Sequence, residues 1–531
     1  MAEGTGSSNE QEAEQWVQEH HHKLPLEELD PTPLENTKEL ENAAAVELDQ
    51  RFTWKKIGTI AACGTALFSD GYVNGSMGNV NTILSKLYKD VMQDKSSTVT
   101  AIGFAGTVVG MLSFGYYSDA VGRKSGMIIA VLIIIVFSAL SSGAYYKGET
   151  VGMVNMLIAW RFFTGVGVGA EYPTGSVAAA EQSEELPKKM QHTPFVLSTN
   201  FVLCLGSVAA SFVPLVLTWI CGENHNRLIW RLTLGLVIVP CLLVLPFRLV
   251  IKQSSLYKKG ALSVRKIPYI LVIRYYWFRL LCISVVWFIY DFINMPFGLF
   301  SSMITTTILG KSADTAPQWQ AFGWSTLIAA FGLPGALLGA FTASFIGPKR
   351  SFMIALALQI IIGFIMSGLF SKLKDSMAAF CVVYGLFQSF GQLGPGSNLG
   401  LLASKSSAAC VKGQFYGVAA AIGKIGAFGG TYAFKTLQSH YTKDDDRWYT
   451  VPFYLASSLA CVSLVILTLF IQERNADCQY QEEIDFRRFL AQHDFDTGQM
   501  GLPDDTSIKT IGSGDTFIGL DEKDAHERAY P

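Results

Sequence analysis

Long apolar stretches, separated by short polar ones, run through most of the chain. A helix needs about 20 mainly apolar residues to cross the hydrocarbon core of a bilayer. Windows of about that length predict twelve transmembrane helices, near residues 56–80, 98–118, 125–146, 151–179, 194–219, 229–250, 276–302, 320–345, 350–370, 376–400, 413–437 and 451–472. The pattern therefore predicts an all-α membrane protein.

Composition agrees with a membrane setting and argues against several other classes. Of the residues, 50% are hydrophobic and 16% are charged, whereas average soluble domains carry about 25% charged residues. The net charge of −2 provides no basic excess, so no nucleic-acid partner is expected. The nine cysteines stand singly, which predicts reduced, buried thiols and no metal site. Because no nucleophile–base pair is recognisable, we expect neither an enzyme nor a cofactor.

Charges between the apolar windows predict the topology. Residues 251–275 contain six lysines and arginines and no acidic residue, and they divide the windows six and six. The positive-inside rule places this linker in the cytoplasm, and the even number of helices then places both termini there. We expect a disordered N-terminal tail (1–51), a six-helix bundle (52–250), the linker (251–275), a second six-helix bundle (276–473) and a C-terminal tail (474–531). Within that tail, "YQEEIDFRRFLAQ" predicts a short amphipathic helix.

The two halves of the chain repeat one loop. The second window is followed by "GYYSDAVGRKSG" (115–126), and the eighth by "ASFIGPKRS" (343–351). A glycine and two basic residues recur at matching places, as Gly122, Arg123 and Lys124 in the first loop and Gly347, Lys349 and Arg350 in the second. Ser344 stands where the first loop has Asp119. This repeat predicts a duplicated bundle with two-fold pseudo-symmetry, as in many transporters.

The loop "GYYSDAVGRKSG" resembles a motif of the major facilitator superfamily, G-x-x-x-D-x-x-G-[RK]-x-G-[RK], over its whole length. Glycines in such a motif permit a tight turn and close approach of helices. The resemblance implies that Asp119 lies near a helix N-terminus and pairs with an arginine across the two halves, which would latch one conformation. The residues expected to control conformation are Gly115, Asp119, Gly122, Arg123, Lys124 and Arg161.

A second stretch, "WRFFTGVGVGAEYPTGSVAAAE" (160–181), resembles the fourth helix of the same superfamily. Its glycines lack the spacing and the preceding strand of a dinucleotide-binding loop, and they favour close helix packing in lipid. The part "GAEYPTGSVAAAE" resembles the phosphate:proton symporter branch, and within it the fungal glycerophosphodiester permeases. The same resemblance is carried by "FSDGYVNG" (68–75), "WFIYDFINMPFG" (287–298) and "AAIGKIGAFGG" (420–430). It implies that helices one, four, seven and ten line a central cavity.

Five ionisable residues lie inside the apolar windows: Asp70, Arg161, Glu171, Asp291 and Lys424. A charge at mid-bilayer costs at least about 2.5–3.5 kcal/mol, so such groups usually face a cavity or a partner. We predict Lys424 as the counter-charge of a phosphate-type anion, and Asp291, Glu171 and Asp70 as proton carriers. An anion is not drawn to three ionised acids, so at least one should be protonated when it binds, and this coupling predicts proton symport.

Each of these assignments has a structural alternative. Lys424 could form a static ion pair with Glu171 or with Asp291, and Asp70 could merely serve helix packing. Arg161 precedes Glu171 by ten residues, or about 15 Å along a helix, so the two cannot pair within it. Arg161 could therefore be a structural arginine.

Several positions depart from the pattern of the phosphate branch. The chain has Glu171 where that branch has aspartate, Val73 in place of a second aspartate, and Met295 in place of an aromatic residue. Helix ten reads "FGQLGPGSN" (390–398) where the branch resembles F-G-P-N. These changes favour a larger, singly charged phosphate ester with polyol or choline substituents. Substrate contacts are expected from Lys424, Tyr172, Asn200, Gln392 and Asn398, and from Trp287 by stacking or cation–π contact unless it only packs.

The leading interpretation is a monomeric, proton-coupled importer of glycerophosphodiesters in the plasma membrane, with a small anionic substrate and protons as its partners. One alternative is an exporter of a secondary metabolite or other organic anion. The antiporter signature expected in helix five is missing from "STNFVLCLGSVAASFVPL" (198–215), which argues against export. An inorganic phosphate symporter and a nutrient receptor that signals through its tails are further alternatives.

Overall fold

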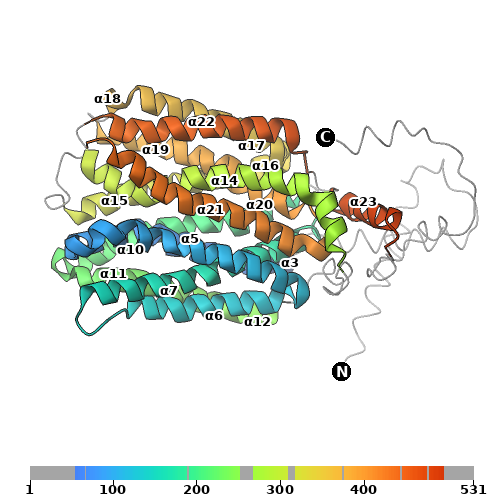
Figure 1. Ribbon diagram of the computed structural model, residues 1–531, viewed down its shortest axis with the longest axis horizontal. Coiled ribbons are helices and arrows are strands. Elements are labelled where there is room, and N and C mark those ends of the chain that lie inside the picture. The colour runs from blue at the N-terminus through green and yellow to red at the C-terminus, as the bar shows by residue number, and fades with distance from the viewer. Residues whose placement is uncertain are drawn as a thin grey trace, which may run out of the picture.

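The computed structural model describes residues 54–65, 67–187, 190–251, 267–308, 317–373, 376–442, 445–474 and 478–495. Within these ranges the regular secondary structure is entirely helical. Long helices lie side by side in one bundle, with the helices of the first half of the chain on one side and those of the second half on the other (Figure 1). The predicted all-α class is confirmed.

Helices of the first half lie between residues 54 and 250. They are α3 (Trp54–Gly64), α4 (Leu67–Leu87), α5 (Lys89–Ala120), α6 (Arg123–Ser142), α7 (Thr150–Glu171), η1 (Tyr172–Ser176), α8 (Val177–Ser183), α9 (His192–Val196), η3 (Leu197–Phe201), α10 (Val202–Cys221), η4 (Glu223–His225), α11 (Asn226–Gly235) and α12 (Ile238–Val250). Each of the first six predicted windows falls on these elements.

Helices of the second half begin at residue 269. They are α14 (Tyr269–Ile308), α15 (Gln318–Ala330), α16 (Gly332–Phe345), α17 (Pro348–Gly368), α18 (Phe370–Leu373), α19 (Met377–Gly391), η6 (Gln392–Gly396), α20 (Ser397–Ser404), η7 (Ala409–Val411), α21 (Lys412–Ser439) and α22 (Arg447–Phe470), followed by α23 (Cys478–Gln492). The last six windows fall on these elements, and α23 confirms the predicted amphipathic helix.

In the described part of the chain, ten helical segments are long and apolar enough to span a membrane. The segments α4 and α21 miss that criterion because they carry more polar residues, including Asp70 and Lys424. Residues 269–275 of the predicted linker belong to α14. Residues 252–266, the N-terminal tail and the C-terminal tail beyond residue 495 lie outside the described residues.

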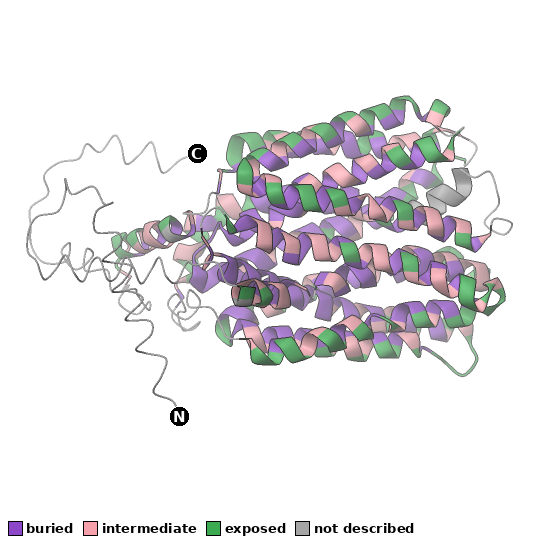
Figure 2. Cartoon of the chain, turned by 180° about the vertical axis from the view of Figure 1, so that it is seen from behind, coloured by how far each residue is buried: buried purple, intermediate pink, exposed green. Residues whose placement is uncertain are grey.

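Burial separates an inner from an outer surface of the bundle. Figure 2 shows buried residues concentrated where helices face one another and exposed residues along their outward faces. Many exposed side chains are large and apolar, such as Leu243 and Phe247 on α12. A contiguous apolar exterior of this kind would be unfavourable in water and is suited to lipid.

The repeated loop has the same geometry in both halves. Gly122 precedes α6 with φ 136° and Gly347 precedes α17 with φ 91°, conformations that favour glycine. The Lys124 ammonium donates to a carbonyl near the end of α12 at 2.7 Å, and the Lys349 ammonium to one near the end of α22 at 3.0 Å. The internal repeat predicted from sequence is therefore present in the structure.

Glycines allow α21 to pack closely against α14. A methyl group added to Gly426 would collide with the backbone carbonyl of Phe288, whereas one added to Gly429 would meet no atom within 4 Å. Backbone atoms cannot move aside as a flexible side chain can, so the helices would have to separate.

We therefore predict that Gly426→Ala lowers the free energy of unfolding by about 1–3 kcal/mol through overpacking. Gly429→Ala, on the same helix, should not destabilise the protein, because alanine favours helix by up to about 1 kcal/mol over glycine. Thermal unfolding of the purified variants in detergent measures both. Equal midpoints for the two variants would contradict the packing argument.

Candidate functional site

Two broken helices position the site. The fourth helical segment passes from α7 through the π-helical turn η1, which contains Pro173, and the tenth passes from α19 through η6, which contains Pro395. Proline has no N–H to donate to the preceding turn, and a π-helical turn accommodates this loss. The turns lie at matching places in the two halves. They bring Tyr172 and Gln392 to one pocket between the halves.

We call this pocket the lysine pocket, after Lys424; it contains about 570 Å³ of space not filled by protein atoms. Its lining residues come from both halves and include Tyr172, Asn200, Trp287, Tyr290, Asp291, Gln392, Tyr416 and Lys424. Lys424 Nζ lies 3.2 Å from Asp291 Oδ2, and both side chains are about 98–99% buried. Among the two static pairs considered for Lys424, the structure forms the one with Asp291.

Asp70 faces this ion pair from the first half. Its carboxylate accepts hydrogen bonds from the Tyr172 hydroxyl and from Asn74 Nδ2. The Lys424 ammonium lies 5.5 Å from the centroid of the Tyr172 ring, so the tyrosine stands between Asp70 and the lysine. Two acids, one lysine and one tyrosine thus form a buried cluster that spans the two halves.

Three more predicted substrate residues line the lysine pocket. Trp287 lies edge-on to Tyr416, with ring centroids 5.5 Å apart. Asn200 Nδ2, from the first half, donates to Gln392 O at 3.2 Å and to a serine hydroxyl of α20 at 3.1 Å. The pocket is therefore lined by helices one, four, seven and ten, as expected, and also by helices five and eleven.

Asn398 lines neither the lysine pocket nor the pocket that adjoins it. It is fully buried, and its Nδ2 donates to the carbonyls of Leu393 and Gly394 at 3.2 and 2.8 Å. These carbonyls belong to the turn η6, which surrounds Pro395. Asn398 is thus placed to stabilise the broken helix, and the expected contact with substrate is not supported by its position.

Glu171 also lies away from the pocket. Its carboxylate pairs with Arg248 at 2.8 Å, and both side chains are buried. Arg248 also donates to the carbonyls of Met127 and Cys63, at 2.9 and 3.1 Å, so it connects several helices of the first half. Sequence reasoning missed Arg248 because a basic residue near the end of an apolar window indicates a membrane boundary.

Arg161 is buried and separate from the other residues expected to control conformation. Its guanidinium donates to the carbonyl of Val73 at 3.3 Å and lies beside Gly103 of α5. It is not among the contacts made by Asp119, which lies at the end of α5. Its position fits the structural alternative.

A second pocket adjoins the first. This amide pocket has about 850 Å³ of empty space and shares Leu203, Met295 and Gln392 with the lysine pocket. Its polar lining is neutral except for Asp70, and consists of Asn74, Ser207, Ser211, Asn294, Ser325, Gln388 and Gln392. Sequence reasoning missed Asn294 and Gln388, because the sequence does not show which amides within apolar windows face a cavity.

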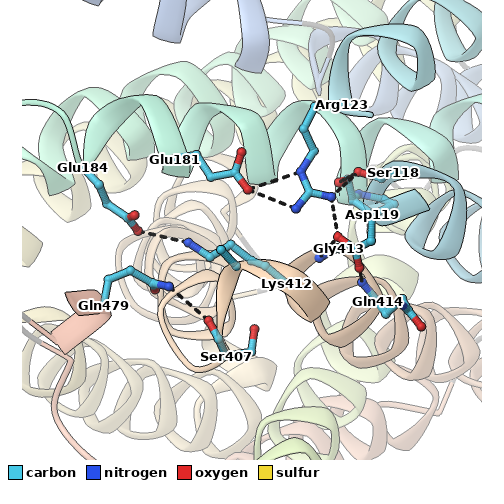
Figure 3. Close-up of polar contacts among 12 residues, drawn as sticks. Ser118, Asp119, Arg123, Glu181, Glu184, Ser407, Lys412, Gly413, Gln414 and Gln479 are labelled. Carbon is cyan, nitrogen blue, oxygen red and sulfur yellow. Dashed lines mark hydrogen bonds and ion pairs between the residues drawn. The ribbon is translucent and has the colours of Figure 1, made fainter. Parts of the chain in front are cut away.

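The Asp119 layer is the set of polar contacts at the end of the bundle where α5 ends and α21 begins (Figure 3). Asp119 accepts hydrogen bonds from the backbone N–H groups of Gly413 and Gln414, at 3.0 and 2.8 Å. Gly115 lies against the same start of α21. The prediction that Asp119 lies at a helix N-terminus is confirmed.

The arginine partner of Asp119 comes from its own half. Arg123 pairs with Asp119 and, at 3.0 Å, with Glu181, all within the first half. Within the described residues, the arginine that pairs with Asp119 is thus Arg123, and the predicted pair with an arginine of the other half is not observed there. Lys412 of α21 instead pairs with Glu184 of the first half at 3.3 Å. Burial raises the pKa of the Glu184 carboxyl, although Lys412 opposes the shift.

The symmetry-related loop also joins the two halves. Ser344, the counterpart of Asp119, lies 2.7 Å from the hydroxyl of Thr193, and His192 Nδ1 lies 3.0 Å from the carbonyl of Ala343. At the opposite end of the bundle, Glu223 accepts a hydrogen bond from the backbone of Gln318 at 2.8 Å. Contacts between the halves thus exist at both ends, on either side of the two pockets.

The chain is similar to known transport proteins. The sugar (and other) transporter family matches residues 57–266. The major glycerophosphoinositol permease GIT3 of Candida albicans is 42% identical over 447 residues, which cover 83% of each chain. The glycerophosphocholine permease GIT4 of the same yeast is 40% identical over 477 residues, 88% of each chain.

A more distant relative and a solved structure extend the comparison. Glycerophosphoinositol transporter 1 of Saccharomyces cerevisiae is 31% identical and covers 91% of this chain and 92% of its own. The proton:xylose symporter XylE superposes with a TM-score of 0.67 over 81% of this chain and 98% of its own, at 15% identity, a likeness of fold alone. With identities of this size over most of its length, the chain belongs to the major facilitator superfamily, in the family of these yeast glycerophosphodiester permeases.

Proposed function

We propose that this protein imports a glycerophosphodiester together with protons across the plasma membrane. The observation that carries the proposal is the buried Lys424–Asp291 pair facing Asp70 and Tyr172 across the two halves. The substrates named for the relatives support the same cargo. A phosphodiester carries one negative charge at physiological pH, and Lys424 is the cation that lines the lysine pocket in the described part of the chain.

The ion pair suggests how proton and anion binding are coupled. While Asp291 is ionised, it pairs with Lys424 and repels a second anion. Protonation of Asp291 would release the lysine to bind the phosphate, and the phosphate's departure would restore the pair. Asp70 is a second proton acceptor in the cluster. For a diester of net charge −1, such as glycerophosphoinositol, uptake with one proton is electroneutral, whereas a second proton would add about 2.3 kcal/mol of driving force per 100 mV.

Two adjoining pockets favour an organic phosphate over free phosphate, because a diester has a headgroup beyond its phosphate. Tyr172, Asn200 and Gln392 line the lysine pocket, and Trp287 offers an apolar wall. Tyr172 and Asn200 would exchange their present hydrogen bonds for bonds to phosphate or hydroxyl oxygens. We assign Glu171 and Asn398 to stabilising the helices that carry these groups.

Transport would alternate the pockets between the two sides of the membrane. In our proposal the Asp119 layer is the cytoplasmic gate, closed in this structure, because the basic linker and both termini are expected on that side. Six-helix bundles at 52–250 and 276–473 would rock against each other around the pockets, within a single chain. Opening would require α21 to leave the carboxylate of Asp119 and Lys412 to leave Glu184.

Uptake measurements test the proposal directly. Cells that lack their own carriers and express the protein should accumulate radiolabelled glycerophosphoinositol or glycerophosphocholine, faster at acidic than at neutral external pH. Phosphate should enter poorly. Accumulation of phosphate alone would contradict the diester assignment, and uptake of a diester independent of pH would contradict proton coupling.

Two substitutions separate the roles of the ion pair. Asp291→Asn keeps the size of the side chain but cannot exchange the proton, so it should abolish accumulation while equilibrium exchange of labelled diester continues. Lys424→Ala removes the counter-charge and should raise the KM by at least about tenfold, since a hydrogen bond to a charged group contributes about 1.5–3 kcal/mol. Lys372→Ala, at an exposed site on α18, serves as the control for expression. An unchanged KM in Lys424→Ala would show that the lysine is structural.

The gate is testable with a thiol reagent. Asp119→Asn weakens the bonds to the start of α21 and to Arg123, so it should favour the conformation in which this layer is open. In a variant that retains Cys410 as its only cysteine, labelling of that buried thiol from the cytoplasmic side should increase several-fold. Asp485→Asn, at a half-exposed position of α23, provides the control. Identical labelling of both variants would exclude the gating role of Asp119.

A further inference from the structure

We infer that the substrate of this protein has a neutral polyhydroxyl headgroup, such as inositol, and that the amide pocket binds it. The inference rests on the proposed function, because it places the phosphate of the same diester at Lys424. It goes further by choosing between polyol and choline diesters, both of which are named among the relatives.

Four residues that line the amide pocket each have a buried side-chain atom without a hydrogen-bond partner within the described residues. These atoms are Asn294 Oδ1, Ser325 Oγ, Gln388 Oε1 and Gln392 Oε1. The residues come from α14, α15, α19 and η6, so four separate elements bring polar side chains to one cavity. Apart from Asp70, the polar lining of this cavity consists of amides and hydroxyls, which favour a ligand that supplies several hydrogen-bonding groups.

Hydroxyl groups match this lining better than charged groups do. Amides and hydroxyls offer donors and acceptors side by side, and each hydroxyl of a polyol both donates and accepts. Among the residues that line the pocket, none is cationic, and Asp70 already accepts hydrogen bonds from Tyr172 and Asn74. The pocket therefore suits a ligand that is polar, uncharged and rich in hydroxyls.

A choline headgroup fits neither pocket as well. Its trimethylammonium has no N–H to donate, so the acceptor oxygens of the amide pocket would stay unpaired. Quaternary ammonium groups bind among several aromatic faces, but Phe104 is the one aromatic residue in the lining of the amide pocket. Aromatic residues gather in the lysine pocket instead, where the ammonium of Lys424 would repel a second cation.

The two pockets are placed to hold the two parts of one diester. They share Leu203, Met295 and Gln392, so the two spaces adjoin at these side chains. In this inference a molecule bound at Lys424 extends past Gln392 into the amide pocket. The phosphate would lie among the charged groups, and the headgroup would reach the amides of Asn294 and Gln388. Gln392, which borders both pockets, would lie next to the bond between them.

Uptake kinetics of two diesters, compared with each other, test this inference. In cells expressing the full-length protein, uptake of radiolabelled glycerophosphoinositol and of radiolabelled glycerophosphocholine is measured over a range of concentrations. Gln388→Met removes the amide at nearly constant volume and is compared with Gln359→Met. Gln359 is a buried glutamine of α17 that lines neither pocket, so its substitution controls for folding.

We expect the unaltered protein to prefer glycerophosphoinositol in kcat/KM by about tenfold or more, because a site built for hydroxyls rejects ligands that lack them. Gln388→Met should raise the KM for glycerophosphoinositol about tenfold and leave that for glycerophosphocholine within about twofold. Gln359→Met should leave the KM for both diesters unchanged. A preference for glycerophosphocholine, or equal losses for both diesters in Gln388→Met, would overturn the headgroup inference while leaving diester import intact. No uptake of either diester by protein at the cell surface would overturn the proposed function and this inference with it.

Discussion

The need to keep the ammonium of Lys424 paired inside the membrane constrains the rest of the structure. A buried charge without a partner is strongly destabilising, and removing one member of a buried pair typically costs about 3–5 kcal/mol. In this conformation Asp291 is the partner, held 3.2 Å away on the neighbouring helix. Any state in which Asp291 is neutral favours a replacement anion at the same place. The chemistry of the site thus follows from one requirement, that the lysine always has a counter-charge.

The architecture and the buried charges were predictable from sequence because both leave local signals. Each transmembrane helix needs its own apolar window, and a charge inside such a window stands out; Asp70, Asp291 and Lys424 were found in this way. Asp119 was predictable because its loop is repeated and resembles a known motif. These predictions needed no knowledge of how distant helices pack.

Features that depend on packing were not predictable. Glu171 has the same local setting as the other buried acids, yet Arg248, 77 positions later, takes it away from the pocket. Asn398 and Asn294 are both asparagines in apolar helices, but Asn398 packs against its own broken helix whereas Asn294 lines the amide pocket. Only the three-dimensional arrangement distinguishes such residues, because sequence spacing does not determine which face meets which neighbour.

One helix, α21, carries both Lys424 and the backbone groups that Asp119 binds. The lysine lies twelve residues after Lys412, or about 18 Å along the helix axis. Because a continuous helix moves largely as a unit, a shift at either place displaces the other. If an anion at Lys424 favours one position of α21, its binding changes the stability of the Asp119 layer. By linkage, opening or closing that layer changes the affinity for the anion by the same free energy. Ligand affinity and closure of the bundle are thus two measurements of a single equilibrium, the position of this helix.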